Sequence, residues 1–174
     1  MPSHNEAPHF MTGSTAGTVC ATLPALSQLV CAQTCDWFDG DIATHERGLY
    51  LATADAGVDD AVAFYERGLR ETLRFASPAD FHWTLSNAPA GQISRELHIQ
   101  GPCYTLVGRG QAVRAVVDHA LFDLARGRVK RALLVACELQ AQPQAAFVAL
   151  YDGRIDVSAI EAHLRQVFPM PSDC

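Results

Sequence analysis

Cysteine thiols, histidine side chains and a glycine-rich turn are the groups in this sequence that could do chemistry. Cys103 lies in a short apolar run and offers a nucleophile. His82 stands between aromatic residues and His119 follows Asp118, so either histidine could serve as a base. We expect both histidines to be structural, because neighbouring positions on a helix, such as those of Asp118 and His119, do not share a face.

Metal and nucleotide sites have only weak signals. Cys31 and Cys35 lie one helical turn apart and His45 follows, but no second pair stands at the spacing of a zinc site. On a helix the two cysteines would share one face and pack as free thiols. Gly108-Arg109-Gly110 lacks the third glycine of a dinucleotide-binding loop. The sequence therefore predicts neither a metal nor a cofactor.

A helix and a short strand would position Cys103. Residues 87–99 have helical spacing, and Gly101-Pro102 ends that run because proline cannot continue a helix. Residues 103–107 are β-prone and end at Gly108. In a strand, Cys103, Thr105 and Val107 share one face while Tyr104 and Leu106 share the other.

A second helix and a buried strand follow the glycine turn. From Gln111 onward the apolar residues recur with helical spacing, and Gly127 ends this helix among basic residues. Residues 132–137 are an unbroken apolar run, which is typical of a buried parallel strand. The order strand, turn, helix, strand predicts one βαβ unit.

The rest of the sequence predicts further helices and strands around this unit. We expect helices over 23–37 and 59–75, a short helix after Ser77 or Asp80, strands over 49–54 and 146–151, and a last helix over 157–167 that starts at Asp156 or Ser158. The helix over 59–75 has a broad apolar face formed by Val62, Phe64, Tyr65, Leu69 and Leu73. Asp152-Gly153 is a hairpin-type turn signal, which makes the strands 132–137 and 146–150 neighbours.

Length and composition indicate one globular domain. The chain has 174 residues, of which 49% are apolar and 18% charged, so it can bury a core. A net charge of −6 argues against a nucleic-acid binder. We expect residues 1–18 to be a flexible tail, with Met11 as an alternative start, and residues 19–170 to be the domain. The sequence shows neither a secretory signal nor a membrane-spanning run, so we expect a cytoplasmic protein with free thiols.

Residues in six successive segments match the motif order of one enzyme family. The matching residues are Asn87, Pro89, Ala90, Gly91, Gln92, Ile93, Gly101, Pro102, Thr105, Leu106, Gly127, Ala132 to Ala136 and Glu138, with the upstream run Arg47 to Ala54. Over roughly residues 45 to 140 the sequence resembles the β-ketoacyl synthases of the thiolase superfamily. Their motifs are an N-x-P-A-G-x-[IL] helix, a G-P-x-x-T-[IL] strand, a turn with the nucleophilic cysteine, a helix, and an LL-V-A-G-x-E strand.

The resemblance fails at the nucleophile. Counting from Gly101-Pro102, the position of the family's cysteine falls on Gly110, in the turn Gly108-Arg109-Gly110-Gln111, and a one-residue slip would place it on Gln111. A synthase needs a thiolate at a helix N-terminus, and glycine offers none. The family's two catalytic histidines belong to a C-terminal half that is not found in this sequence. The resemblance therefore implies a degenerate N-terminal half, similar to chain-length factors.

The resemblance also implies a fold and an interface. We expect an α/β domain like half of a thiolase fold, with helices layered on a mixed, mainly parallel five-stranded sheet. In the family, the strand before the nucleophile pairs across a dimer. The interface would then be formed by Cys103, Tyr104, Thr105, Leu106 and Val107. A lone half would leave this edge uncovered, so we expect a ketosynthase subunit or a second copy to cover it.

Three functions remain open at this point. The first is a non-catalytic subunit in fatty-acid-like, aryl-polyene or polyketide biosynthesis that supports a partner's acyl tunnel. The second is an acyltransferase or condensing enzyme that uses the thiol of Cys103. The third is a remnant that binds only an acyl chain or a carrier protein. Arg126, Arg128, Lys130 and Arg131 could dock an acidic acyl-carrier protein, or could simply form the basic end of a helix.

Overall fold

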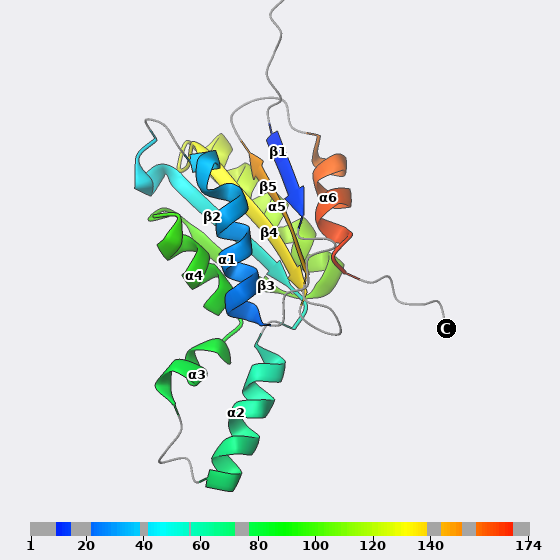
Figure 1. The fold of residues 1–174 in the computed structure, drawn as a ribbon. Coiled ribbons are helices and arrows are strands. Elements are labelled where there is room, and N and C mark those ends of the chain that lie inside the picture. Colours follow the sequence, from blue (N-terminus) through cyan, green and yellow to red (C-terminus); the bar gives the residue numbers. More distant parts are fainter. Residues whose placement is uncertain are drawn as a thin grey trace, which may run out of the picture.

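A five-stranded mixed sheet forms the centre of the computed structural model (Figure 1). The structure describes residues 10–14, 22–38, 42–55, 57–71, 77–138, 144–150 and 156–168. The strands are β1 (Phe10–Ser14), β2 (Arg47–Thr53), β3 (Cys103–Val107), β4 (Arg131–Glu138) and β5 (Gln144–Leu150). The helices are α1 (Leu23–Thr34), α2 (Val58–Glu71), α3 (Pro78–Trp83), α4 (Ala88–Glu96), α5 (Arg109–Ala125) and α6 (Val157–Arg165), with short 3₁₀ turns at Cys35–Phe38 and Thr44–Glu46.

The strand order confirms the predicted sheet. The order is β1-β5-β4-β2-β3, with β2 parallel to both β3 and β4. β5 runs antiparallel to β4 and β1 runs antiparallel to β5. The predicted neighbours, 132–137 and 146–150, therefore pair as expected, and β3 lies at one edge of the sheet. The turn signal at Asp152-Gly153 lies outside the described residues.

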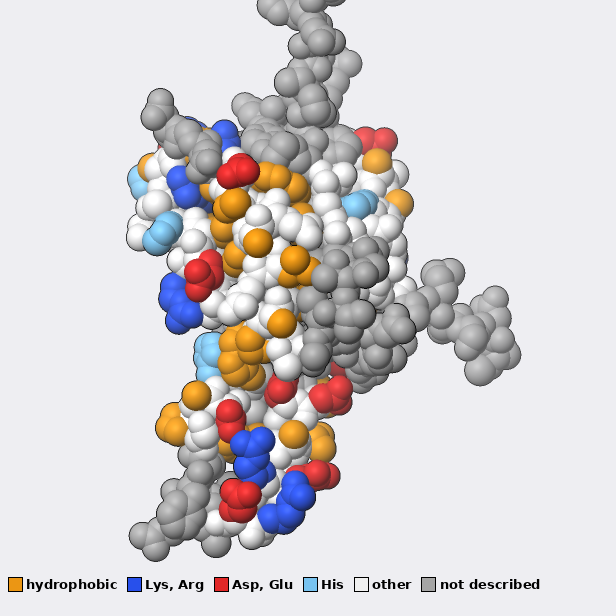
Figure 2. All heavy atoms as spheres, in the orientation of Figure 1, with side chains coloured by type: hydrophobic (Ala, Val, Ile, Leu, Met, Phe, Trp, Pro, Cys, Tyr) orange, Lys and Arg blue, Asp and Glu red, His pale blue; other side chains and the backbone are white. Residues whose placement is uncertain are grey.

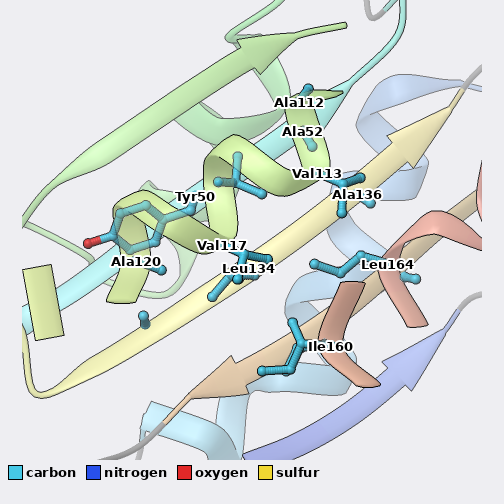
Figure 3. Packing of buried hydrophobic residues seen from close by; sticks show 14 of the residues in the cluster. Tyr50, Ala52, Ala112, Val113, Val117, Ala120, Leu134, Ala136, Ile160 and Leu164 are labelled. Carbon is cyan, nitrogen blue, oxygen red and sulfur yellow. The ribbon is translucent and has the colours of Figure 1, made fainter. Parts of the chain in front are cut away.

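Two apolar layers hold helices on both faces of the sheet. On one face, α5 and α6 pack on Tyr50, Ala52, Leu134 and Ala136 (Figure 3). On the other face, α1 and α4 pack on Leu49, Leu51, Leu133, Val135 and Phe147. β2, β4 and β5 are buried on both faces, which explains why their sequences are continuous apolar runs without alternation.

Several helix ends lie where the sequence places them. Gly127 follows α5 with a φ of 66°, and its N–H donates to the carbonyl of Leu124. Ser77 caps α3, because its side chain accepts from the N–H of Asp80. The side chain of Asp156, rather than that of Ser158, caps α6 by accepting from the N–H of Ala159 at 3.1 Å.

Two predictions about the elements are corrected. Residues 10–14 fall within the predicted tail but form β1, which pairs with β5 in register from Phe10–Leu150 to Ser14–Ala146. The periodicity of five residues is too short to reveal an edge strand, and Gly13 lacks a side chain so that the ring of Phe147 can lie against it. The helix predicted from Gln111 begins instead at Arg109, so Gly110 lies in its first turn.

The helix predicted over 59–75 forms as α2, but its apolar face is not part of the core. α2 and α3 project from one end of the sheet as a two-helix arm (Figure 1). Val62, Tyr65 and Leu69 are exposed, and Leu73 lies outside the described residues. Phe64 faces α3, where the rings of Phe64 and Phe81 lie 5.7 Å apart, and Arg67 pairs with Asp80 of α3. No helix in the described ranges is long and apolar enough to span a membrane.

Candidate functional site

The glycine turn between β3 and α5 leads directly into a helix N-terminus and carries no nucleophilic side chain. Gly108 has a φ of 137°, which a side chain would strain, and the chain then turns directly into α5. The first turn of α5 presents free backbone N–H groups and the positive end of the helix dipole. Such a turn can stabilise an anion, but Gly110 supplies no side chain that could become one.

Arg165 occupies the space into which a side chain at Gly110 would point. A Cβ atom built on Gly110 would lie 2.8 Å from Nη1 of Arg165, at the end of α6. Arg165 also pairs with Glu161 at 3.1 Å, and Glu161 pairs with Arg114 of α5 at 3.0 Å. Arg114 in turn binds Asp118 through Nε at 3.0 Å. This chain of ion pairs ties α6 to α5 and places a guanidinium group beside the turn.

Cys103 lies away from this turn. It is at the opposite end of β3 from Gly108, and its sulfur interacts with Ser94 of α4. α4 covers the face of the sheet opposite to α5, so Cys103 and Gly110 lie on different faces. Burial of the sulfur raises the pKa of Cys103, and the hydrogen bond from Ser94 only partly offsets this effect. Cys103 is exposed, but its raised pKa leaves less of the reactive thiolate at neutral pH.

β3 is an edge strand with one row of backbone groups directed outward. The N–H of Leu49 donates to the carbonyl of Pro102, and the N–H of Gly108 donates to the carbonyl of Thr53. Because residues in a parallel ladder alternate, Tyr104 and Leu106 also direct their backbone groups at β2. The N–H and C=O groups of Cys103, Thr105 and Val107 consequently face the open edge. The predicted alternation of side chains is also confirmed, since Tyr104 and Leu106 pack toward α5.

A pocket of about 370 Å³ lies between β3 and α5. Tyr104 and His119 line it with their ring centroids 5.5 Å apart, and the ring centroid of Tyr50 lies 5.7 Å from that of Tyr104. At its base, the hydroxyl of Tyr50 donates to Asp123 at 2.9 Å, and Arg128 contacts the same buried carboxylate at 3.3 Å. Burial, and next the hydrogen bond to Asp123 and the charge of that carboxylate, raise the pKa of Tyr50, so the phenol stays protonated.

The basic residues predicted as a docking patch are partly used within the fold. Arg128 pairs with Asp123, Lys130 pairs with Glu46 at 2.8 Å, and Nη1 of Arg131 donates to the carbonyl of Trp37 at 2.6 Å. Arg126 lies over the ring of Phe122 at 5.0 Å. The four cations share one end of the α5–β4 connection, but much of their charge is neutralised locally.

The remaining candidate residues do not converge on a site. His119 is exposed, and its Nδ1 hydrogen-bonds to the carbonyl of Ala115. His82 is exposed and its ring lies edge-on to Trp83. Cys31 is half-buried with a pKa raised to about 11, chiefly by burial. In the part of the chain that the structure describes, no group of three or more His, Cys, Asp or Glu side chains could hold a metal ion.

Sequence reasoning did not find two features of this region. Arg165 is far from Gly110 in the sequence, and only the packing of α6 against α5 brings them together. The buried carboxylate of Asp123 was hidden in a helix with ordinary amphipathic spacing. The sequence gives one signal of it: Asp123 follows the apolar residue Ala120 by three positions, which places its charge on the helix face that the core covers.

Comparison with known proteins gives structural matches only. No family model and no curated protein sequence matches the chain. The ishigamide ketosynthase/chain length factor matches with a TM-score of 0.61 at 13% identity, covering 80% of this chain and 46% of that one. The Xenorhabdus doucetiae ketosynthase ApeO in complex with its chain length factor ApeC matches with a TM-score of 0.58 at 11% identity, covering 87% of this chain and 72% of that one.

A β-ketoacyl synthase from Burkholderia phymatum matches with a TM-score of 0.55 at 11% identity, covering 74% of this chain and 41% of that one. The chain thus spans less than half the length of two of these three structures. At such identities the likeness concerns the fold, which agrees with the predicted partial thiolase-like architecture. The protein has a ketosynthase-like, chain-length-factor-like α/β fold.

Proposed function

We propose that this protein is a non-catalytic ketosynthase-like subunit that supports acyl-chain binding by a partner ketosynthase in fatty-acid-like, aryl-polyene or polyketide biosynthesis. Gly110 in the first turn of α5 is the main support. A helix N-terminus can stabilise a thiolate, but this one carries a glycine, and the guanidinium of Arg165 fills the adjoining space. The chain therefore keeps the turn and its electrostatics while lacking the reacting atom.

The alternative function, an acyl transfer by Cys103, has less support. Its sulfur faces α4 rather than the turn, and burial raises its pKa. No described histidine contacts it to act as a base, since its one described side-chain partner is Ser94. An acyl group on this thiol would also lie on the opposite face of the sheet from the N-terminus of α5.

The partner would bind along β3. The edge offers the backbone groups of Cys103, Thr105 and Val107, and the side chains of this strand carry no charge. An antiparallel strand centred on Thr105 could exchange hydrogen bonds with all three residues. Uncovered edges of this kind are normally paired or covered. We infer that a strand of a ketosynthase pairs with β3, and that this complex forms in the cytoplasm. An acyl-carrier protein would approach the side of the domain that carries Arg126, Arg128, Lys130 and Arg131.

Val107→Lys is expected to release the ketosynthase from the protein. Val107 is 60% exposed at the open edge, so a lysine there leaves the fold intact but places a charge in the paired strands. Tagged variants recovered from the host are compared by the amount of ketosynthase that copurifies, and we expect at least about a tenfold loss. Ala162→Lys, on the exposed side of α6, adds the same charge on a helix that packs on β4 and β5, and should retain the partner. Equal recovery with both variants would contradict the proposed interface.

A further inference from the structure

The arm formed by α2 and α3 carries an apolar stripe that the described chain does not cover. Val58, Val62, Tyr65 and Leu69, here called the α2 stripe, are 47%, 52%, 59% and 67% exposed. The arm extends away from the sheet (Figure 1), and Figure 2 shows apolar side chains beside charged ones on it. α2 buries only Gly68 among its own residues, on the side that faces α3.

The spacing of the α2 stripe is that of a helix–helix seam. Its residues follow each other at intervals of four, three and four positions, which is the a/d pattern of two heptads. A helix with this pattern packs its seam against another helix at a shallow angle. α3 does not provide that helix, because it lies on the neighbouring side of α2, against Phe64.

The α2 stripe is complementary in volume to a second copy of itself. Its first half carries two valines, and its second half carries the larger Tyr65 and Leu69. An antiparallel pair related by a twofold axis would place Val58 against Leu69 and Val62 against Tyr65 of the other copy. Each layer would then combine one small and one large side chain, so the seam is filled evenly. A parallel pair would instead stack small on small and large on large.

The charges on α2 favour the same arrangement. Asp59 and Asp60 lie at its N-terminal end, while Arg70 at its C-terminal end is followed by Glu71. Within the described residues neither the two aspartates nor Arg70 forms an ion pair, and burial, together with the charge of Asp59, raises the pKa of Asp60. Antiparallel pairing keeps the acidic N-terminal ends of the two helices apart and opposes the two helix dipoles. Glu66 lies on the same flank, where Arg70 of its own helix is one turn away.

We propose that the α2 stripe is a self-association surface, on which the arms of two copies of this chain pack as antiparallel α2 helices. This surface is separate from the β3 edge. The α2 stripe and the β3 edge share no residue, so a substitution in one leaves the residues of the other unchanged. The inference therefore does not depend on the proposed function, and either can fail alone.

Sedimentation equilibrium of the purified full chain tests the self-association. Leu69→Asp puts a charge in the seam at a position 67% exposed in the single chain, and we expect it to raise the dimer dissociation constant at least about tenfold. Ala63→Asp is the matched control, because Ala63 is exposed on another side of α2 and should dimerise like the parent. Val107→Lys should also leave this dimer intact. A monomeric parent chain, or equal effects of Leu69→Asp and Ala63→Asp, would overturn the proposal.

Disulfide trapping tests the antiparallel register. In an oxidised mixture of Val62→Cys and Tyr65→Cys chains, we expect the main disulfide to join position 62 of one chain to position 65 of another. Peptide mapping distinguishes this disulfide from any that involve the native cysteines. Ala63→Cys chains, mixed with Tyr65→Cys chains under the same conditions, should form no disulfide between positions 63 and 65. A dominant disulfide between two Val62→Cys chains would mean parallel pairing and would contradict the proposed arrangement.

Discussion

Gly101→Ala is expected to lower the free energy of unfolding by about 3 kcal/mol, and the melting temperature by roughly 6–12 °C. A Cβ atom on Gly101 would lie 2.4 Å from the carbonyl oxygen of Arg47 and 2.6 Å from that of His45. Both are backbone atoms, one in the 3₁₀ turn before β2 and one in the first residue of β2, so neither can move aside like a flexible side chain. The turn would have to shift and pull β3 away from β2, where the N–H of Leu49 donates to Pro102.

Gly91→Ala is the matched control for this experiment. Gly91 lies within α4, and a Cβ atom there would meet nothing within 4 Å. Alanine in a helix interior is favoured over glycine, so this variant should be more stable by about 0.5–1 kcal/mol. Urea unfolding followed by circular dichroism measures both changes. If the two glycine variants shifted the midpoint in the same direction, the close approach at Gly101 would not exist in the folded protein.

Gly110→Cys is expected to create a reactive thiol with a pKa below that of free cysteine. The new side chain would stand in the first turn of α5 beside Arg165, whose guanidinium ends a flexible side chain and can move to accommodate it. The helix N-terminus and the neighbouring cation both stabilise a thiolate. At neutral pH the reaction with iodoacetamide or an acyl thioester should be roughly tenfold faster than that of an ordinary surface thiol. Intact-protein mass spectrometry measures the adduct.

Two variants separate the contributions to this effect. Gly110→Cys combined with Arg165→Gln should react more slowly than Gly110→Cys alone, because the helix end remains but the cation is gone. Ala162→Cys, on an exposed face of α6, provides the ordinary thiol. The parent protein should form no acyl adduct at Cys103, in keeping with its raised pKa. If Gly110→Cys titrated like Ala162→Cys, the turn would lack the electrostatics assigned to it.

The core of the fold could be predicted from the sequence because its elements are long or sharply bounded. The apolar run at 132–137 and the helix ended by Gly127 leave few alternatives, and both form as β4 and α5. The alternation in β3 placed Cys103 and Tyr104 on opposite faces, as the structure confirms. β1 could not be found, because five residues that include a glycine carry little periodic signal.

The surroundings of the turn depend on contacts between distant segments. Gly110 was located by counting along the sequence, but Arg165 reaches it only through the packing of α6 on α5. The amphipathic pattern of α2 predicted a helix correctly. It could not show that the apolar face points away from the sheet, because periodicity gives a face but not what covers it.

Native mass spectrometry of the tagged protein, recovered from its own host, tests the central claim most directly. We expect a complex with a ketosynthase chain in equal stoichiometry, with one or two copies of each chain. No acyl group should be attached to this subunit, because Gly110 offers no nucleophile. Recovery of this chain only as a monomer or as a homodimer, without a ketosynthase, would contradict the proposed role as a supporting subunit.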